Sequence, residues 1–428
     1  MRTFSPGSVR GKRLTACVPG SKSITNRALL TAALAYGKST LRGVLFSDDS
    51  RHLMECLKTL GIPMEVREEE REAEISGCGG SLPAESARVD VGSAGTAARF
   101  LAAVFGLSSG TYRMDSSDQM KKRPMGALVH SLREAGASIR CLEEEGHFPM
   151  EITGNGGRSA SYTVDIDQSS QFLSALLIAA GANRRAVEIR VTGTHGQAYI
   201  GMTVSMMRQF GASVRKDGPV YRIPQGSHYT GRDYAVEPDV SAACYFYAAA
   251  AVLGISVCVP GVHSGSLQGD LRFLEILRKM GCRIAEEPEG IVVTGPENGR
   301  IHGITADFGA FSDQSMTLAA IAPFADSPVE ITGIGHIRLQ ESDRLHGIAA
   351  ELGRCGIRCE EREDSIRIYP GTPKPALIRT YDDHRMAMSF ALTGLRAPGI
   401  VIDNPMCCRK TFENYFAVLD RFCDELEA

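Results

Sequence analysis

Basic side chains stand at the start of a predicted helix near the N-terminus of this 428-residue chain. In the segment PGSKSITNRALL, Lys22, Ser23 and Arg27 precede or open an apolar helix. Cations there oppose the positive end of the helix dipole, and a bound anion resolves that conflict. The motif therefore indicates an anion site, although a Ser cap beside two solvated cations explains it equally well.

Polar groups open further predicted helices. The run KKR at 121–123 precedes Pro124, which is expected as the first helical residue, but a basic run is also typical of a solvated face. The segment QSSQF at 168–172 offers two hydroxyls and an amide to a phosphate or a sugar hydroxyl, and alone it reads more simply as a helix cap.

Acidic residues and further cations occupy similar places in the second half of the chain. Asp313 in SDQSMTLAAIA is expected as a helix N-cap. Glu341 and Arg344 lie three residues apart, which predicts an ion pair on one helix face. Short C-terminal motifs add three more candidates: His384, Arg385 and Lys410.

A sixfold repeat explains why such residues recur. Helices of one kind are predicted to begin near six positions about 71 residues apart: Ser23, Thr96, Ser170, Ser241, Ser315 and His384. Helices of a second kind end in a glycine suited to a left-handed C-cap, at Gly61, Gly136, Gly211, Gly281 and Gly356. The chain is therefore predicted to be α/β, with units that read strand, helix, strand, helix, strand, strand and that pack as two groups of three. Helix N-termini gathered at one end of each group face a shared cleft and make it an anion site.

The sequence also predicts turns within the repeat and the origin of a strand that its last copy lacks. The turns GNGG at 154–157 and KDG at 216–218 resemble hairpin turns. The last copy reaches its second helix at about 411–426 and lacks a strand, which residues 11–18 are expected to supply.

Composition restricts the class of protein. With 43% hydrophobic and 23% charged residues and a net charge of -3, the chain is typical of a globular protein without general attraction for nucleic acid. The opening residues lack a secretory apolar stretch, so a cytosolic location is expected. The apolar run 242–259 is interrupted by Gly254, which favours a buried helix followed by a strand over a membrane span. The twelve cysteines are expected to be reduced and mostly buried.

The ordered motifs PGSKSITNRALL, GSAGTAARFLAA, MKKRPMGALV, SSQFLSALL, QESDRL, DDHRMAM and KTF resemble those of the 5-enolpyruvylshikimate-3-phosphate synthases, a family of enolpyruvyl transferases. The resemblance extends from about Arg13 to Phe412. It implies an inside-out α/β barrel with two similar domains, each of three βαβαββ units with buried helices. One domain would comprise residues 1–20 and 238–428 and the other residues 21–237, with the active site in the cleft between them.

The same resemblance implies transfer of the enolpyruvyl group of phosphoenolpyruvate to the 5-hydroxyl of shikimate 3-phosphate. It assigns shikimate 3-phosphate contacts to Lys22, Ser23, Arg27, Ser169, Ser170, Gln171, Tyr199, Asp313, His336 and Gln340. It assigns phosphoenolpyruvate contacts to Lys22, Gly95, Arg123, Gln171, Arg344, His384, Arg385 and Lys410. We expect no metal, no cofactor and no binding to nucleic acid or to a membrane. We expect the protein to be a monomer.

The implied chemistry needs one group to take the proton of the attacking hydroxyl and another to protonate the methylene carbon. We expect Asp313 to be the base and Glu341, with Lys22 nearby, to be the donor. A closing hinge would exclude water.

Four positions depart from the family pattern. Gly196 and Gln340 stand where the family usually has Ser and Lys, and His336 and Ser93 each stand where it usually has Asn. Because Gln340 removes a charge and a possible proton donor, an impaired sugar-phosphate-binding relative is one alternative. Two others are a transferase acting on UDP-N-acetylglucosamine, which would have Asn in place of Ser23, and an RNA 3'-phosphate cyclase, which would use a nucleophilic His and ATP.

Overall fold

The computed structural model describes residues 2–428. The chain divides into two compact units. Unit 1 combines the residues up to Pro19 with Glu237–Ala428, and unit 2 is Gly20–Val236. The chain therefore passes from one unit to the other after Pro19 and again after Val236.

Unit 2 contains six α-helices of seven residues or more, one short helix and twelve strands. Its helices are α1 (Lys22–Leu34), α2 (Asp48–Thr59), α3 (Gly95–Leu107), α4 (Asp118–Lys121), α5 (Gly126–Glu134), α6 (Gln171–Gly181) and α7 (Gln197–Gln209). Its strands are β2 (Tyr36–Arg42), β3 (Met64–Arg67), β4 (Glu72–Cys78), β5 (Ser86–Asp90), β6 (Thr111–Asp115), β7 (Ser138–Cys141), β8 (Met150–Thr153), β9 (Ser161–Asp165), β10 (Val187–Thr192), β11 (Arg215–Asp217), β12 (Val220–Ile223) and β13 (Asp233–Ala235). They form three four-stranded sheets in the orders β13-β2-β4-β3, β5-β6-β8-β7 and β11-β12-β10-β9.

Unit 1 repeats this pattern. Its α-helices are α8 (Val240–Leu253), α9 (Arg272–Lys279), α10 (Ser315–Ile321), α11 (Arg344–Arg354), α12 (His384–Gly394) and α13 (Tyr415–Glu427). Short 3-10 turns span Gly269–Leu271, Ser312–Gln314, Ala322–Phe324, Gly335–Leu339 and Pro405–Lys410. Its strands are β1 (Arg13–Thr15), β14 (Ser256–Pro260), β15 (Arg283–Glu287), β16 (Gly290–Thr294), β17 (Thr305–Asp307), β18 (Val329–Thr332), β19 (Cys359–Glu361), β20 (Ser365–Ile368), β21 (Ala376–Ile378) and β22 (Ile400–Ile402). The sheet orders are β1-β14-β16-β15, β17-β18-β20-β19 and β21-β22.

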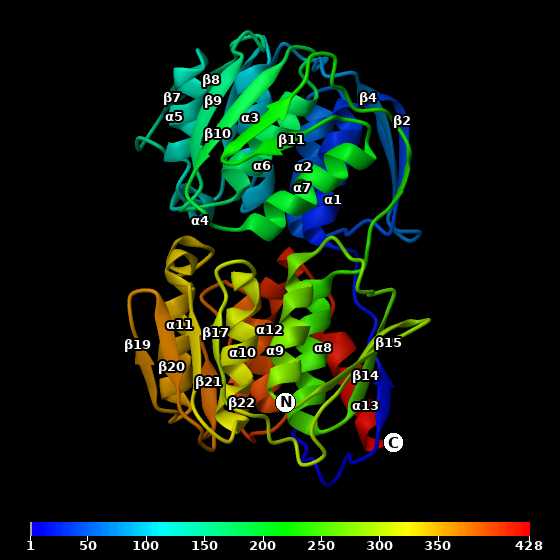
Figure 1. Cartoon of the computed structure of the whole chain (residues 1–428), viewed down its shortest axis with the longest axis vertical. Coiled ribbons are helices and arrows are strands. Elements are labelled where there is room, and N and C mark those ends of the chain that lie inside the picture. The colour runs from blue at the N-terminus through cyan, green and yellow to red at the C-terminus, as the bar shows by residue number, and fades with distance from the viewer. Residues whose placement is uncertain (1) are drawn as a thin grey trace. The chain divides into compact units, whose positions relative to one another are not determined.

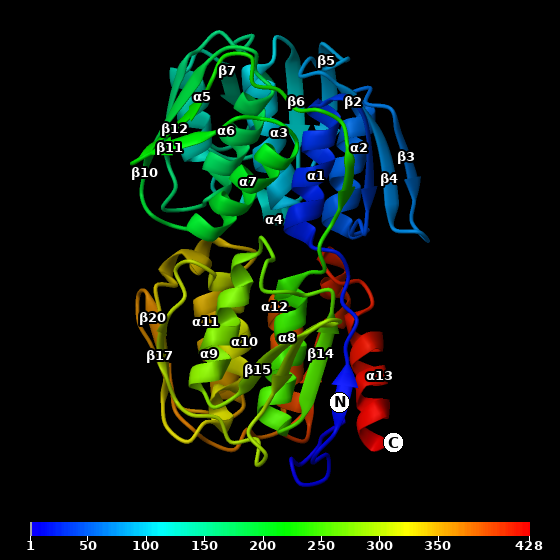
Figure 2. The same ribbon diagram turned by 45° about the vertical axis from the view of Figure 1, so that its right-hand side comes forward.

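Apolar helices fill the interior of each unit. In α3, α6, α8, α10 and α12 nearly every side chain is buried, because these helices are apolar on all sides. Within unit 1, α8, α10 and α12 pack against one another, and Figure 1 and Figure 2 show strands around them. The predicted α/β class with repeated βαβαββ-like units is confirmed.

The helices of the second kind end as predicted. Gly61, Gly136, Gly211, Gly281 and Gly356 all have positive φ, between 71° and 101°. After α7, the N–H of Gly211 donates to the Arg208 carbonyl and that of Ala212 to the Met207 carbonyl, both in the last turn of the helix. This pair of bonds defines a Schellman motif, and the other four helices have the same pair.

Two local predictions are wrong. Residues 11–18 do not complete the last copy, because β1 pairs in parallel with β14, in the sheet of the fourth copy. In that sheet β1 occupies the place that the repeat would give to β13, the strand before α8, because β13 pairs with β2 of unit 2. The turn GNGG joins β8 to β9, which lie in different sheets, whereas KDG does close the β11–β12 hairpin.

The apolar run 242–259 forms most of α8 and β14. No helix in residues 2–428 is both long and apolar enough to cross a membrane. All twelve cysteines are free thiols, and Cys17 is the exposed one.

Candidate active site

Three carboxylates and three cations form one buried cluster in unit 1. Arg344, the first residue of α11, lies at its centre and is 2% exposed at its side chain. Its Nε is 2.7 Å from Asp383 Oδ2, its Nη2 is 2.7 Å from Glu341 Oε2, and its Nη1 is 3.2 Å from Asp313 Oδ1. Two of the carboxylates predicted to do chemistry therefore share one guanidinium.

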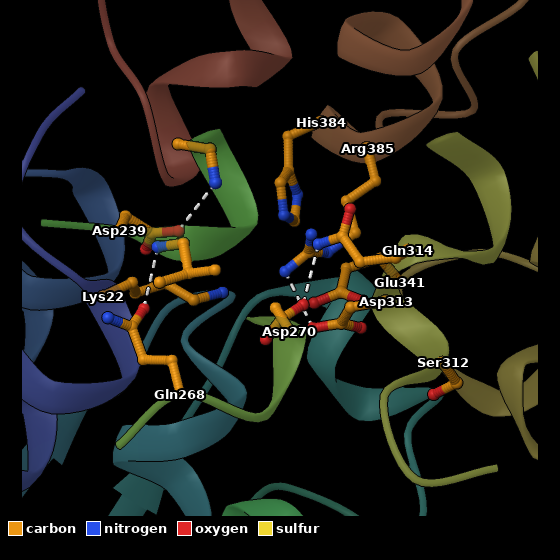
Figure 3. Close-up of polar contacts among 12 residues, drawn as sticks. Lys22, Asp239, Gln268, Asp270, Ser312, Asp313, Gln314, Glu341, His384 and Arg385 are labelled. Atoms are coloured by element: carbon orange, nitrogen blue, oxygen red, sulfur yellow. Dashed lines mark hydrogen bonds and ion pairs between the residues drawn. The ribbon is translucent and has the colours of Figure 1, made fainter. Parts of the chain in front are cut away.

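Two more cations reach the same carboxylates. Arg385 Nη2 lies 2.7 Å from Asp313 Oδ2 (Figure 3). Lys410 Nζ lies 3.5 Å from Glu341 Oε1. Burial by itself lowers the pKa of Arg344, but the nearby Asp383, Glu341 and Asp313 outweigh it and hold that pKa above its ordinary value. The guanidinium at the centre thus stays charged.

Helix starts position these side chains. Asp383 is the N-cap of α12, and its carboxylate accepts the Arg385 N–H at 3.0 Å while it also holds Arg344. His384 is the first residue of α12, buried, with Nδ1 3.7 Å from Asp383 Oδ1. Lys410 ends the 3-10 turn Pro405–Lys410 and is buried as well.

Asp313 lies in the 3-10 turn Ser312–Gln314, directly before α10. Its side chain is 26% exposed, the most accessible in the cluster. On one side of this turn, His336 Nε2 lies 2.8 Å from Ser312 Oγ. Gln340 follows the turn Gly335–Leu339 and is half-buried next to Glu341.

In unit 2 the candidates lie at the starts of the buried helices. Lys22, Gly95 and Gln171 are the first residues of α1, α3 and α6. Lys22 Nζ is 3.7 Å from Asp49 Oδ2, a carboxylate in the first turn of α2. Ser23 is the second residue of α1.

Arg27 is buried among neutral groups. Its Nε donates to Thr203 Oγ1 at 2.8 Å and its Nη1 to the Ser23 carbonyl at 3.0 Å. Its guanidinium lies 5.3 Å from the centre of the Phe100 ring. Burial lowers the pKa of Arg27 to about 10, an effect that the phenol of Tyr199 partly opposes.

Arg123 is buried beside the start of α3. A Cβ on Gly95 would lie 2.4 Å from Arg123 Nη1 and 2.7 Å from Arg99 Nη1, so any other residue there would displace these two guanidinium groups. Arg99 donates to the carbonyls of Gly95 at 3.2 Å and Pro124 at 3.0 Å, and so ties the segment that carries Arg123 to α3.

The start of α6 meets the start of α7. Ser169 Oγ accepts the Gln171 N–H at 3.2 Å, and Ser170 is buried. Gly196 has φ +65°, and a Cβ there would lie 2.4 Å from Ser170 Oγ. Gly196, where the family usually has Ser, therefore makes a close contact with Ser170 that a serine side chain would disturb.

Three local expectations fail. Pro124 is not the first residue of a helix, because α5 begins at Gly126 with Met125 as N-cap. Asp313 is not the N-cap of α10, since its carboxylate binds two guanidinium groups instead. Glu341 and Arg344 do form an ion pair, but Glu341 precedes α11 and shares no helix face with Arg344.

Four residues that contact the candidates within their own unit escaped the sequence analysis: Asp383, Asp49, Arg99 and Tyr245. Asp383 was detectable, because an Asp directly before a predicted helix is an N-cap signal. Asp49, which pairs with Lys22, and Tyr245, whose hydroxyl accepts from Arg385 Nη1 at 3.5 Å, have no local signal, because their partners are distant in sequence. Arg99 lies one helical turn after Gly95 in α3 but carries no helix-start signal. In residues 2–428, no group of three or more His, Cys, Asp or Glu side chains is arranged to hold a metal ion.

Comparison with solved structures defines the class of fold. The chain matches the EPSP synthase of Acinetobacter baumannii with a TM-score of 0.79 and 26% identity, over 96% of each chain. It matches the enolpyruvyl transferase NikO of Streptomyces tendae with a TM-score of 0.73 over 96% of each chain, and at 17% identity that likeness concerns the fold alone. The architecture is that of the enolpyruvyl transferases.

Sequence comparison is more specific. The family profile described as EPSP synthase (3-phosphoshikimate 1-carboxyvinyltransferase) matches residues 10–419. A 3-phosphoshikimate 1-carboxyvinyltransferase of Trichormus variabilis is 45% identical over 93% of this chain and 94% of its own length. One from Nostoc sp. is 44% identical over 95% of this chain and 96% of its own length. The chain belongs to the EPSP synthase family.

Proposed function

We propose that the residues described above carry the reaction of the family, 3-phosphoshikimate 1-carboxyvinyl transfer in the shikimate pathway, which is the activity of this chain. Its substrates are phosphoenolpyruvate and shikimate 3-phosphate. Each bears a carboxylate and a phosphate, so binding both requires several fixed cations. We assign Arg123, Arg344, Arg385 and Lys410, with Lys22, Gly95, Gln171 and His384, to phosphoenolpyruvate. We assign Lys22, Ser23, Arg27, Ser169, Ser170, Gln171, Tyr199, Asp313, His336 and Gln340 to shikimate 3-phosphate.

The reaction is an addition followed by an elimination. Asp313 takes the proton of the 5-hydroxyl as its oxygen bonds to C2 of phosphoenolpyruvate, and Glu341, assisted by Lys22, protonates C3. In the elimination, Glu341 takes a proton back from C3 while phosphate leaves C2 and accepts the proton held by Asp313, so both carboxyl groups return to their starting states. Charge separation in both steps is stabilised by fixed guanidinium groups rather than by reorienting water.

One observation carries this assignment: Asp313 and Glu341 are bound to the same guanidinium, that of Arg344, at 3.2 and 2.7 Å. Arg344 is held in turn by Asp383. Two carboxylates fixed about one immobile cation suit a proton acceptor and a proton donor that act on one small substrate pair.

The test is the variant Asp313→Ala. We expect the rate of phosphate release from shikimate 3-phosphate plus phosphoenolpyruvate to fall by about 100-fold or more, with an unchanged circular dichroism spectrum. Asp326→Ala, which removes an exposed unit 1 carboxylate bonded to His302, is the matched control and keeps its rate. Near-normal turnover of Asp313→Ala would refute the assignment.

UDP-N-acetylglucosamine serves as the comparison acceptor in the same assay, and we expect no phosphate release with it. A protein impaired by Gln340 would bind shikimate 3-phosphate yet release no phosphate. The monomeric state and the cytosolic location stay predictions from the sequence.

A further inference from the structure

A chain of buried polar groups links the entry of the polypeptide into unit 1 with the turn that carries Asp313. Glu237 is the first residue of unit 1 after the second crossing. Its carboxylate accepts hydrogen bonds from the Ser266 hydroxyl and, at 3.2 Å, from the Leu267 N–H. The crossing segment is therefore tied to the loop 266–270, which precedes α9.

Gln268 tightens this attachment. Its Nε2 donates to the Pro238 carbonyl at 2.8 Å and to Glu237 Oε2 at 3.1 Å, and its Oε1 accepts the Val240 N–H at 2.9 Å. Its side chain is buried. Since both ends of the amide are used, Gln268 holds the loop and the first turn of α8 in one arrangement.

Two residues further on, Asp270 reaches the catalytic turn. Asp270 Oδ1 accepts a hydrogen bond from Gln314 Nε2 at 2.7 Å, and both side chains are buried (Figure 3). Gln314 directly follows Asp313 in the turn Ser312–Gln314. Its Oε1 accepts the Thr317 hydroxyl at 3.0 Å, so this amide also has a single orientation.

The surroundings of Asp270 disfavour its charged form. Burial, together with the nearby Asp313 and Asp239, raises its pKa to about 6, although Arg385 and the hydrogen bond from Gln314 act in the opposite direction. The Cys244 thiol donates to the Asp270 carbonyl at 3.8 Å and is the neighbouring group on α8. A buried carboxyl whose charged form is disfavoured in this way adds little to stability, so its presence points to a functional role rather than a structural one.

We propose that Gln268 and Asp270 are positioning residues that hold Asp313, through Gln314, in a fixed relation to the crossing segment Glu237–Asp239. A displacement of that segment would then move the proton acceptor. Neither residue needs to touch a substrate. This inference rests on the role proposed for Asp313.

The variants Gln268→Leu and Asp270→Leu each cut one link, and Asp270→Asn keeps an acceptor for Gln314 without the charge. Gly265→Ala is the control, because it lies in the preceding turn and a Cβ there meets no atom within 4 Å. For each variant we would measure kcat, both KM values, the Kd of shikimate 3-phosphate and the dependence of kcat on pH.

We expect Gln268→Leu and Asp270→Leu to lower kcat by about 10- to 100-fold with Kd and KM changed by less than about threefold, because misplacement of a base affects the chemical step. Asp270→Asn should keep more of kcat than Asp270→Leu, because its side-chain oxygen can still accept the hydrogen bond from Gln314 Nε2. The acidic limb of its pH profile should stay in place, since Asp270, whose pKa is raised to about 6, is already uncharged there.

Unchanged kcat in Gln268→Leu and Asp270→Leu would overturn the inference, as would losses of kcat and binding in equal proportion or an Asp270→Asn variant no more active than Asp270→Leu. If Asp270→Leu does not fold, Gln268→Leu and Asp270→Asn still decide. Active Asp313→Ala would refute the role proposed for Asp313, on which this inference rests, whereas inactive Asp313→Ala with fully active Gln268→Leu and Asp270→Leu refutes only this inference.

Discussion

Arg27 combines burial with an absence of carboxylate partners among residues 2–428. Its guanidinium donates to Thr203, Ser23 and, at 3.5 Å, Ser174. Taking a cation out of water is unfavourable unless an anion compensates it. A phosphate dianion is such an anion, so this residue favours binding at the expense of the stability of the free protein.

Replacing Arg27 by Met should therefore stabilise the ligand-free protein by about 1–3 kcal/mol and abolish measurable binding of shikimate 3-phosphate. The hydroxyl of Thr203 stays satisfied, because it also bonds Ser174 Oγ and the Tyr199 carbonyl, both at 3.0 Å. Thermal unfolding measures the change in stability, and calorimetric titration measures the binding of shikimate 3-phosphate. Arg27→Lys, which keeps the charge, is the control and should show no stabilisation; a lower Tm for Arg27→Met would contradict the reasoning.

At the scale of residues, the sequence predicted the cations, but of their partners it predicted only Glu341, which pairs with Arg344. Lys22, Arg344 and Arg385 stand at helix starts, where their charge is conspicuous in a sequence. That Arg344 binds Asp313 and Asp383 depends on contacts across 31 and 39 residues, which periodicity does not encode. Their pairing makes the unit 1 set a cluster of three cations and three carboxylates, of which the sequence predicted only the pair of Glu341 with Arg344.

At the scale of elements, the sequence patterns predicted helix starts and helix ends correctly where the pattern concerned a single helix. The six buried helices begin within one residue of their predicted starts, and the five glycines end theirs as predicted. The rules failed where tertiary pairing decides, as for β1, and where a 3-10 turn replaced a cap, as for Asp313. Such outcomes depend on partners distant along the chain.

Helix α7 offers a matched pair of glycine substitutions. Gly211 follows the helix with φ +97°, and Gly201 lies inside it where a Cβ meets no atom within 4 Å. Gly211→Ala should destabilise the protein by about 1 kcal/mol, and Gly201→Ala should stabilise it by about 0.5–1 kcal/mol. Chemical denaturation monitored by circular dichroism measures both; changes of the same sign would contradict the assigned backbone conformations.

At the scale of the whole molecule, one buried carboxyl makes the stability of unit 1 depend on pH. The pKa of Asp270 is raised from its ordinary value of 3.8 to about 6. The folded state thus keeps this proton at a pH where the unfolded state has lost it. The favourable contribution is complete below about pH 4 and is lost as the pH rises to about 6, by at most about 3 kcal/mol.

Asp270→Asn should remove this dependence. We expect the Tm difference between the variant and the unchanged protein to be more positive at pH 7.5 than at pH 4.5. Differential scanning calorimetry at the two pH values checks it, with Glu425→Ala, which removes an exposed carboxylate of α13, as a surface control for general effects of charge. Equal differences at both pH values would show that Asp270 titrates normally.

The division into units also predicts which fragments fold. Residues 20–236 contain every strand of their three sheets, so they should fold alone with cooperative thermal unfolding. Residues 237–428 lack β1 and the buried side chains Phe4, Val9 and Leu14. This fragment should show sharp, dispersed NMR signals only when residues 2–19 are joined to its C-terminus by a short linker or added as a peptide. Independent folding without them would contradict the role given to β1.

The pairing of β1 with β14 also has a temporal consequence. Arg13 lies opposite Ser256, 243 residues later in the chain. At roughly 5–20 residues per second, a nascent N-terminal strand waits on the order of 10–50 s before its neighbour leaves the ribosome. During that interval all of unit 2 emerges and can fold, while the first twenty residues stay exposed to chaperones and proteases. Slow codons after position 236 would lengthen that vulnerable period without altering a single contact of the finished protein.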